Sequence, residues 1–141
     1  MSDRWDKFKA LETRLQEISD VTVETWDGVD NAFNDDKVYP YVAVAYYAKR
    51  GKPNLQIPGA VIGVSYVYYI YVATDDQEEA MDLMDSIDEK LLGWELPNEM
   101  GKIDISNMLN FEVAESLVEA HDGKYLYAQA FQVDDVEDYE Q

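Results

Sequence analysis

The 141-residue chain carries a formal net charge of −19, and hydrophobic residues make up 47% of it. It is long and apolar enough to bury a core, so we expect one folded domain over residues 1–141 rather than a disordered chain. The absence of cysteine excludes disulfides and thiolate chemistry. The acidic excess argues against binding to nucleic acid or to anionic membranes, because such binding depends on Lys and Arg.

The first part of the chain is expected to form one helix and two strands. Apolar residues at three- and four-residue spacing predict an amphipathic helix from about 3 to 19: Trp5, Phe8, Leu11, Leu15 and Ile18. A short strand is predicted at 21–25, and alternating side chains predict another at 39–48. The segment 49–60 holds two prolines and two glycines, so it is expected to form a loop instead of continuing the strand.

A central strand and a second helix are predicted in the middle of the chain. Residues 61–74 are β-branched and aromatic on both faces, as in a strand that is covered on both sides. Thr74 and Gln77 match a capping box at the start of the helix, and Asp75 with Glu78 offers an alternative register. A lysine in the last turn and a glycine just beyond it fit the end of this helix.

The last part of the chain is expected to form three strands, at 103–106, 111–118 and 125–133. Asp122-Gly123 is a signal for a two-residue hairpin turn, and an acidic tail follows at 134–141. The predicted order is α-β-β-β-α-β-β-β. This order indicates an α+β fold, with a mainly antiparallel mixed sheet and two helices.

Two rows of side chains suggest how the two faces of the sheet are used. Small residues predict a face on which helices pack closely: Ala43, Ala45, Ala128 and Ala130. Aromatic residues mark a second face: Tyr46, Tyr68, Tyr125 and Tyr127. Because two helices cannot easily cover both faces, we expect the aromatic face to bind a partner.

No group of residues predicts catalysis. His121 is the only histidine, it lies next to the predicted hairpin turn, and no partner is evident that would orient it. Acidic pairs such as Asp35-Asp36 do not match a calcium-binding loop, and no phosphate-binding glycine loop or nucleophile elbow is present. We therefore expect a protein that is not an enzyme and that needs no metal and no cofactor.

A basic cluster opens the segment that follows the second predicted strand. Lys49, Arg50 and Lys52 are the only such cluster after the first helix. One interpretation is an ordinary solvated hairpin loop. The other is an arm that reaches an acidic surface on a neighbour and buries Leu55 and Ile57 there.

Three segments and their order resemble a known family. They are an extended stretch with a proline at 38–42, a helix end with a Gly-Trp pair at 84–94, and a closing hairpin at 122–131. These features are similar to the tail terminator proteins of Mu-like and lambda-like bacteriophages. The family's helix is likewise followed by a Leu-x-Gly-Trp/Phe sequence and a proline.

The resemblance implies a ring, usually of six copies, that caps the tail tube and stops its growth. The implied partners are copies of the chain itself, the tail tube protein, the head–tail connector or neck proteins, and the sheath where the tail has one. Genomic DNA would pass through the lumen without specific binding, and no membrane would be involved. The protein would be made in the bacterial cytoplasm and reside in the tail or neck of the virion.

Two alternatives remain open at the level of sequence. The chain could be another neck or tail-completion protein of related fold. It could also be an acidic DNA mimic that inhibits a DNA-binding enzyme, because a loose row of carboxylates lies along the second predicted helix: Glu78, Asp82, Asp85 and Glu89.

Overall fold

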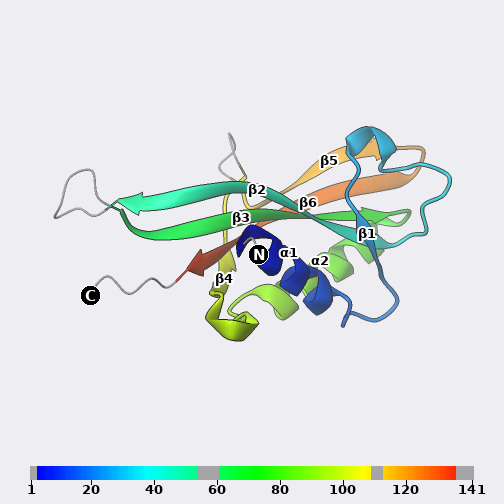
Figure 1. The fold of residues 1–141 in the computed structure, drawn as a ribbon. Helices are drawn as coiled ribbons and strands as arrows, with labels where there is room; N and C mark the ends of the chain where they lie inside the picture. The colour runs from blue at the N-terminus through cyan, green and yellow to red at the C-terminus, as the bar shows by residue number, and fades with distance from the viewer. Residues whose placement is uncertain (1–2, 54–60, 109–112, 136–141) are drawn as a thin grey trace.

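The computed structural model describes residues 3–53, 61–108 and 113–135, and in this part it shows two helices on a six-stranded sheet (Figure 1). The helices are α1 (Asp3–Leu15) and α2 (Gln77–Leu91). The strands are β1 (Thr22–Thr25), β2 (Tyr41–Pro53), β3 (Val61–Thr74), β4 (Lys102–Ile105), β5 (Glu115–His121) and β6 (Lys124–Asp135). Short 3-10 turns are η1 (Val29–Asn31) and η2 (Pro97–Glu99). The predicted α+β class and element order are confirmed.

The sheet is mixed, and its strands lie in the order β1-β2-β3-β6-β4, with β5 also paired to β6. β1 runs parallel to β2, and the other pairs are antiparallel. β4 and β5 share the outer side of β6, one after the other along its length. β1 accompanies β2 only from Tyr41 to Val44. Among the described residues, the outer side of β2 therefore has no partner strand from Ala45 onward.

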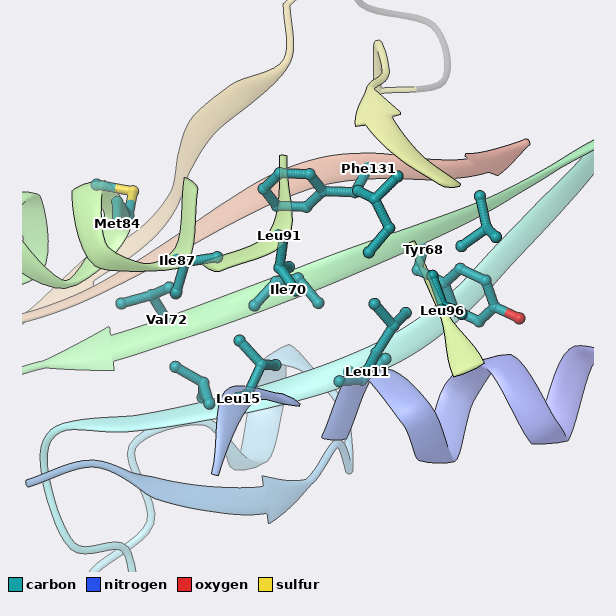
Figure 2. Packing of buried hydrophobic residues seen from close by; sticks show 14 of the residues in the cluster. Leu11, Leu15, Tyr68, Ile70, Val72, Met84, Ile87, Leu91, Leu96 and Phe131 are labelled. Carbon is teal, nitrogen blue, oxygen red and sulfur yellow. The ribbon is translucent and has the colours of Figure 1, made fainter. Parts of the chain in front are cut away.

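Both helices pack on one face of the sheet, and the main core lies between the helices and that face (Figure 2). α1 contributes Leu11 and Leu15, and α2 contributes its stripe of Leu83, Met84, Ile87 and Leu91. The facing side chains from the sheet are Tyr66, Tyr68, Ile70, Val72 and Phe131. Alternation along β3 places its even-numbered residues on this face, which we name the helix-covered face.

The expected use of the two faces was wrong. Tyr68 and Phe131 lie under the helices, whereas Ala43, Ala128 and Ala130 lie on the opposite face. That opposite face is covered in part by the segment between β1 and β2, where the rings of Trp26 and Tyr71 stack 3.7 Å apart. β3 is apolar on both faces, so its sequence alone did not show which face the helices would choose.

β2 is longer than predicted, because it continues into the segment 49–60 that was expected to form a loop and ends at Pro53. Lys49 pairs with Tyr66 and Gly51 with Val64, so the basic cluster begins on a strand. A proline is tolerated here because it ends the strand, where one ladder hydrogen bond fewer matters little. Figure 1 shows β2 and β3 projecting to the left, beyond both helices.

The ends of other elements also differ from the sequence prediction. α1 ends at Leu15, and β5 starts at Glu115 rather than near 111. β6 runs to Asp135, so the first two residues of the expected acidic tail belong to the sheet. Residues 136–141 lie outside the described residues. The Asp122-Gly123 turn is confirmed, with φ angles of 50° and 76° that match a two-residue hairpin.

The N-terminus of α2 is capped by Asp76 instead of either predicted register. An Asp76 carboxylate oxygen accepts a hydrogen bond from the Glu78 backbone N–H at 3.0 Å. Thr74 stays in β3, where it pairs with Tyr125, and its hydroxyl donates to the Asp76 carbonyl at 2.9 Å. Because the strand continues to Thr74, the helix starts later than the capping box implied.

Replacing Tyr68 by phenylalanine is expected to lower the free energy of unfolding by about 1 kcal/mol. The buried Tyr68 hydroxyl donates a hydrogen bond to the Arg4 carbonyl at 2.7 Å and fixes the start of α1 over β3. Denaturant unfolding measures the loss. The matched control is Tyr47→Phe, since Tyr47 is exposed on the same sheet, and its stability should stay unchanged. Equal effects of the two changes would contradict the role given to the Tyr68 hydroxyl.

Candidate assembly interface

Three basic side chains gather around the ring of Tyr66 on the helix-covered face. The Nζ atoms of Lys7 and Lys49 lie 4.6 Å and 5.3 Å from the ring centroid, and the Arg4 guanidinium carbon lies 5.9 Å away. Arg4 also lies 5.7 Å from the ring of Tyr46, and its Nε donates a hydrogen bond to the Tyr46 hydroxyl at 3.2 Å. Arg4, Lys7 and Lys49 form what we name the cationic cluster.

Local structure explains why these cations meet. The first turn of α1 is held over β3 by the Tyr68 hydroxyl, and Lys49 is the β2 residue paired with Tyr66. A cation over an aromatic face is attracted by the ring quadrupole. Lys7 is only 2% exposed, whereas Arg4 and Lys49 are exposed. The hydrogen bond to Tyr46 is the main cause that raises the pKa of Arg4 above its usual value, so this group stays charged.

A second charged surface follows the outward side of α2. It consists of exposed carboxylates: Glu78, Asp82, Asp85 and Glu89. We name these four residues the acidic ridge. Their spacing of three and four residues places them along one side of the helix, away from the core stripe. Within the part of the chain that the structure describes, none of them forms an ion pair.

Asp88 lies beside the ridge and is half-buried against β6. Its carboxylate accepts a hydrogen bond from the Gln129 side-chain amide at 3.0 Å. Burial, followed by the nearby charges of Glu115 and Asp85, raises the pKa of Asp88, and the Gln129 hydrogen bond acts in the opposite direction. Burial, and then repulsion from Glu115 and Asp85, therefore disfavour the ionised form of this carboxylate in the folded chain.

Asp88→Asn is expected to stabilise the fold at neutral pH, because it removes a negative charge that burial and the charges of Glu115 and Asp85 disfavour. The gain should be only about 0.5 kcal/mol, because solvent screens much of this effect. The folded pKa exceeds the ordinary value of 3.8, so the native state binds the proton more tightly than the unfolded state. The cost of ionisation appears as pH rises through the folded pKa and is absent below 3.8. Thermal melts from pH 3 to 7 should show a gain that fades toward acid. Asp36→Asn, in an exposed loop, should show no gain, and a pH-independent gain at Asp88 would contradict the account.

The four predicted interface tyrosines occupy different environments. Tyr46 is 37% exposed at the free side of β2, and its ring meets that of Tyr68 edge-on at 5.4 Å. Tyr68 is fully buried, so it supports Tyr46 from below instead of forming surface. Tyr125 and Tyr127 are partly buried on β6, and the Tyr127 hydroxyl lies 3.4 Å from the Gln77 side-chain amide. Tyr46 remains a candidate for direct contact with a neighbour.

The predicted basic cluster divides between the two faces. Lys49 joins Arg4 and Lys7, whereas Arg50 donates a hydrogen bond to the Asn107 carbonyl at 3.2 Å. Lys52 pairs with Gly63 in the sheet, but its side chain lies outside the described residues. Leu55 and Ile57 also lie outside the described residues, so the proposed arm remains a prediction.

Sequence reasoning missed the exposed Arg4 and the buried Lys7 as parts of the cationic cluster. Both lie on α1 at helical spacing from the buried Leu11, which places cations on the apolar stripe at the start of the helix. That irregularity in the stripe was the available signal. Its meaning depends on Tyr66, more than fifty residues away in the chain, and no local pattern links them.

The residues that the sequence analysis considered for catalysis or metal binding, namely His121 and the acidic pairs, are not gathered into one site in the described part of the chain. Nε2 of His121 lies 3.1 Å from a carboxylate oxygen of Asp122, in an exposed turn. Over residues 3–53, 61–108 and 113–135, no three acidic or histidine side chains are grouped as a metal site would require. Neither helix described is long and apolar enough to cross a membrane.

Similarity between this chain and known proteins is found in the fold and not in the sequence. No family model matches the sequence. No curated protein matches it either. Among solved structures, the chain is similar to one from the virion of a native gene transfer agent particle, with a TM-score of 0.53 and 13% sequence identity. The match covers 89% of this chain and 91% of that one, so the two share nearly the whole α+β fold.

Proposed function

We propose that the chain is a structural subunit of a phage-type virion, and that it forms a ring that terminates the tail tube. The observation that carries this proposal is the shared fold with a chain of a gene transfer agent virion over about nine-tenths of both chains. The resemblance of segments 38–42, 84–94 and 122–131 to tail terminators supports the finer assignment. The role is structural rather than enzymatic.

The edges of the sheet support self-assembly. The outer sides of β2 from Ala45 and of β5 have no partner strand among the described residues. The outer side of β4 is closed, because Ile103 exchanges backbone hydrogen bonds with Gly93 and Trp94 at 2.9 and 3.0 Å. Exposed strand edges favour association, and a closed ring removes them. The candidate contacts are therefore Tyr46 and the basic residues at the β2 edge of the sheet, and β5 at the opposite edge.

The experiment is assembly with the tail tube protein of the same genome. Electron microscopy should show rings of this chain, and its addition to growing tubes should shorten them and leave a ring at one end. A neck or tail-completion protein of the same fold would form oligomers but leave tube length unchanged. That result would contradict the terminator assignment and keep the structural one.

The acidic ridge favours a second candidate, a DNA mimic. Four exposed carboxylates along one helix could occupy a phosphate-binding groove. A mimic would remain a monomer and would inhibit a DNA-binding enzyme at equimolar amounts. Light scattering of the purified chain, combined with a nuclease inhibition assay, separates the two candidates.

A further inference from the structure

Among the described residues, the open edges of the sheet lie at opposite corners (Figure 1). On one side, β1 covers β2 up to Val44, so the edge of β2 is open from Ala45 to Pro53. On the other side, β5 is open, and the pairing through β6 and β3 places Glu115 level with Val44. Beyond that level lies β4, whose outer side is closed by residues 93–94. A neighbour that adds its β5 to the open edge of β2 is therefore displaced along the strands.

The two edges carry charges of opposite sign. β2 presents Lys49 and Arg50 along its open edge, whereas β5 presents the exposed Glu115 and Glu119. Charged side chains on edge strands usually prevent pairing with other chains. Here they prevent it selectively, because two β2 edges or two β5 edges repel, whereas a β2 edge and a β5 edge attract. The charges thus favour contact between unlike edges, which is the head-to-tail contact that a ring needs.

Exposed side chains on the helix-covered face select one register. Alternation places four of them on this face: Lys49 and Tyr46 of β2, and Glu115 and Leu117 of β5. Placing Glu115 opposite Lys49 also brings the two apolar side chains opposite each other. The bulge at Tyr47 makes this match possible, because it adds one residue to β2 between the two positions. Leu117 is 47% exposed and Tyr46 is 37% exposed, so their contact removes apolar surface from water.

We propose that β5 of one copy pairs with the open edge of β2 of the next copy, with Glu115 opposite Lys49. Leu117 then contacts Tyr46 of the next copy. This inference rests on the proposed self-assembly and assigns the contact between copies. The pairing is antiparallel, because β5 runs antiparallel to β2 within one chain and a ring repeats that orientation. Repeated around a ring, the contact joins all the sheets into one closed barrel.

The register gives a strand tilt that suits a closed barrel. Glu115 is level with Ile70 in its own chain and becomes level with Tyr66 of the next copy. This displacement of four residues along β3 is about 14 Å. The strands β2, β3, β6 and β5 together span about 19 Å across the sheet. The ratio corresponds to a tilt of about 35°, which lies in the range of about 35–45° found in closed barrels, and it holds for any number of copies.

The register can be tested by disulfide trapping, because the chain has no cysteine of its own. In the variant with Tyr46→Cys and Leu117→Cys, each thiol lies opposite its counterpart on a neighbouring copy. Oxidation should therefore shift most of the protein from monomer to covalently linked oligomers on a non-reducing gel. Within one chain the two positions lie about 20 Å apart across the sheet, too far for a disulfide. The matched control is Tyr46→Cys with Ala120→Cys, on the same face of β5 but out of register, and it should stay monomeric on the gel.

A charge swap tests the ion pair independently. Lys49→Glu alone, or Glu115→Lys alone, places like charges opposite each other at every junction. Each should raise the concentration for half-assembly about fivefold, as measured by sedimentation velocity. A chain that carries both changes restores one opposite pair at each junction, so it should assemble like the wild type. Damage to the fold from either substitution would not be rescued in this way.

The outcomes separate this inference from the proposed function. If the wild type assembles but the Tyr46–Leu117 cysteine pair links no better than its control, the register is wrong while self-assembly stands. Single charge changes without effect, or a double change that fails to rescue them, would contradict the pairing of Glu115 with Lys49. A wild type that stays monomeric with and without tube protein overturns the proposed function itself.

Discussion

Ile87→Ala is expected to lower the free energy of unfolding by about 3 to 4 kcal/mol. Ile87 is fully buried at the centre of the stripe with which α2 contacts the sheet, among Met84, Leu91 and the side chains of β3 (Figure 2). Removing three carbons leaves a cavity between two rigid elements that cannot easily collapse. The measurement is urea unfolding followed by circular dichroism.

Met81→Ala is the matched control for this change. Met81 lies on the same helix but is 54% exposed, so its truncation should alter stability by less than about 0.5 kcal/mol. A small effect at Ile87, comparable to that at Met81, would show that α2 is not packed as described. Because the acidic ridge belongs to α2, its position relative to the cationic cluster depends on this packing.

Gly101→Ala is expected to destabilise the fold by about 3 kcal/mol. Gly101 has a φ angle of 129°, and an added Cβ would lie 2.6 Å from the Asp134 carbonyl oxygen and 2.8 Å from a methyl carbon of Val133. The clash involves the β6 backbone, which cannot move without disturbing its pairing with β4. Thermal melting should therefore show a much lower midpoint.

Gly93→Ala separates the clash from the backbone conformation. Gly93 also has a positive φ, 78°, but nothing lies within 4 Å of the site of an added Cβ. Its substitution should cost only about 1 kcal/mol, from the left-handed conformation alone. Equal losses at the two glycines would contradict the close approach of 101 to β6.

The elements with strong local signals could be predicted from the sequence. The end of α2, with a lysine in its last turn and a glycine just beyond it, and the Asp122-Gly123 turn depend on residues close in the chain, and both are found where the pattern placed them. The element order followed from these signals and from the long apolar run of β3. The fold class was therefore accessible without a structure.

Features that depend on distant pairing could not be predicted. The extension of β2 past Ala48 depends on hydrogen bonds to β3, which override the local preference of prolines and glycines for a loop. The two faces of β3 are both apolar, so only the packing of the helices shows which one they cover. For the same reason, Tyr68 was expected at a surface and is buried beneath α1.

The candidate interface was predicted in part. Tyr46 and Lys49 were identified from strand alternation and from charge, and the structure brings them to one rim. Arg4, which is exposed, and Lys7, which is buried, join Lys49 around Tyr66 from α1, whereas Arg50 donates a hydrogen bond to the Asn107 carbonyl instead. A cluster assembled from three separate elements depends on the fold, so sequence spacing alone could not define it.

Native mass spectrometry of the purified chain, alone and with tail tube protein, measures self-assembly directly. Closed oligomers of one fixed copy number are expected, and electron microscopy should show them as rings seated on the ends of tubes. A chain that remains monomeric at every concentration, with tubes that grow as if it were absent, would contradict it.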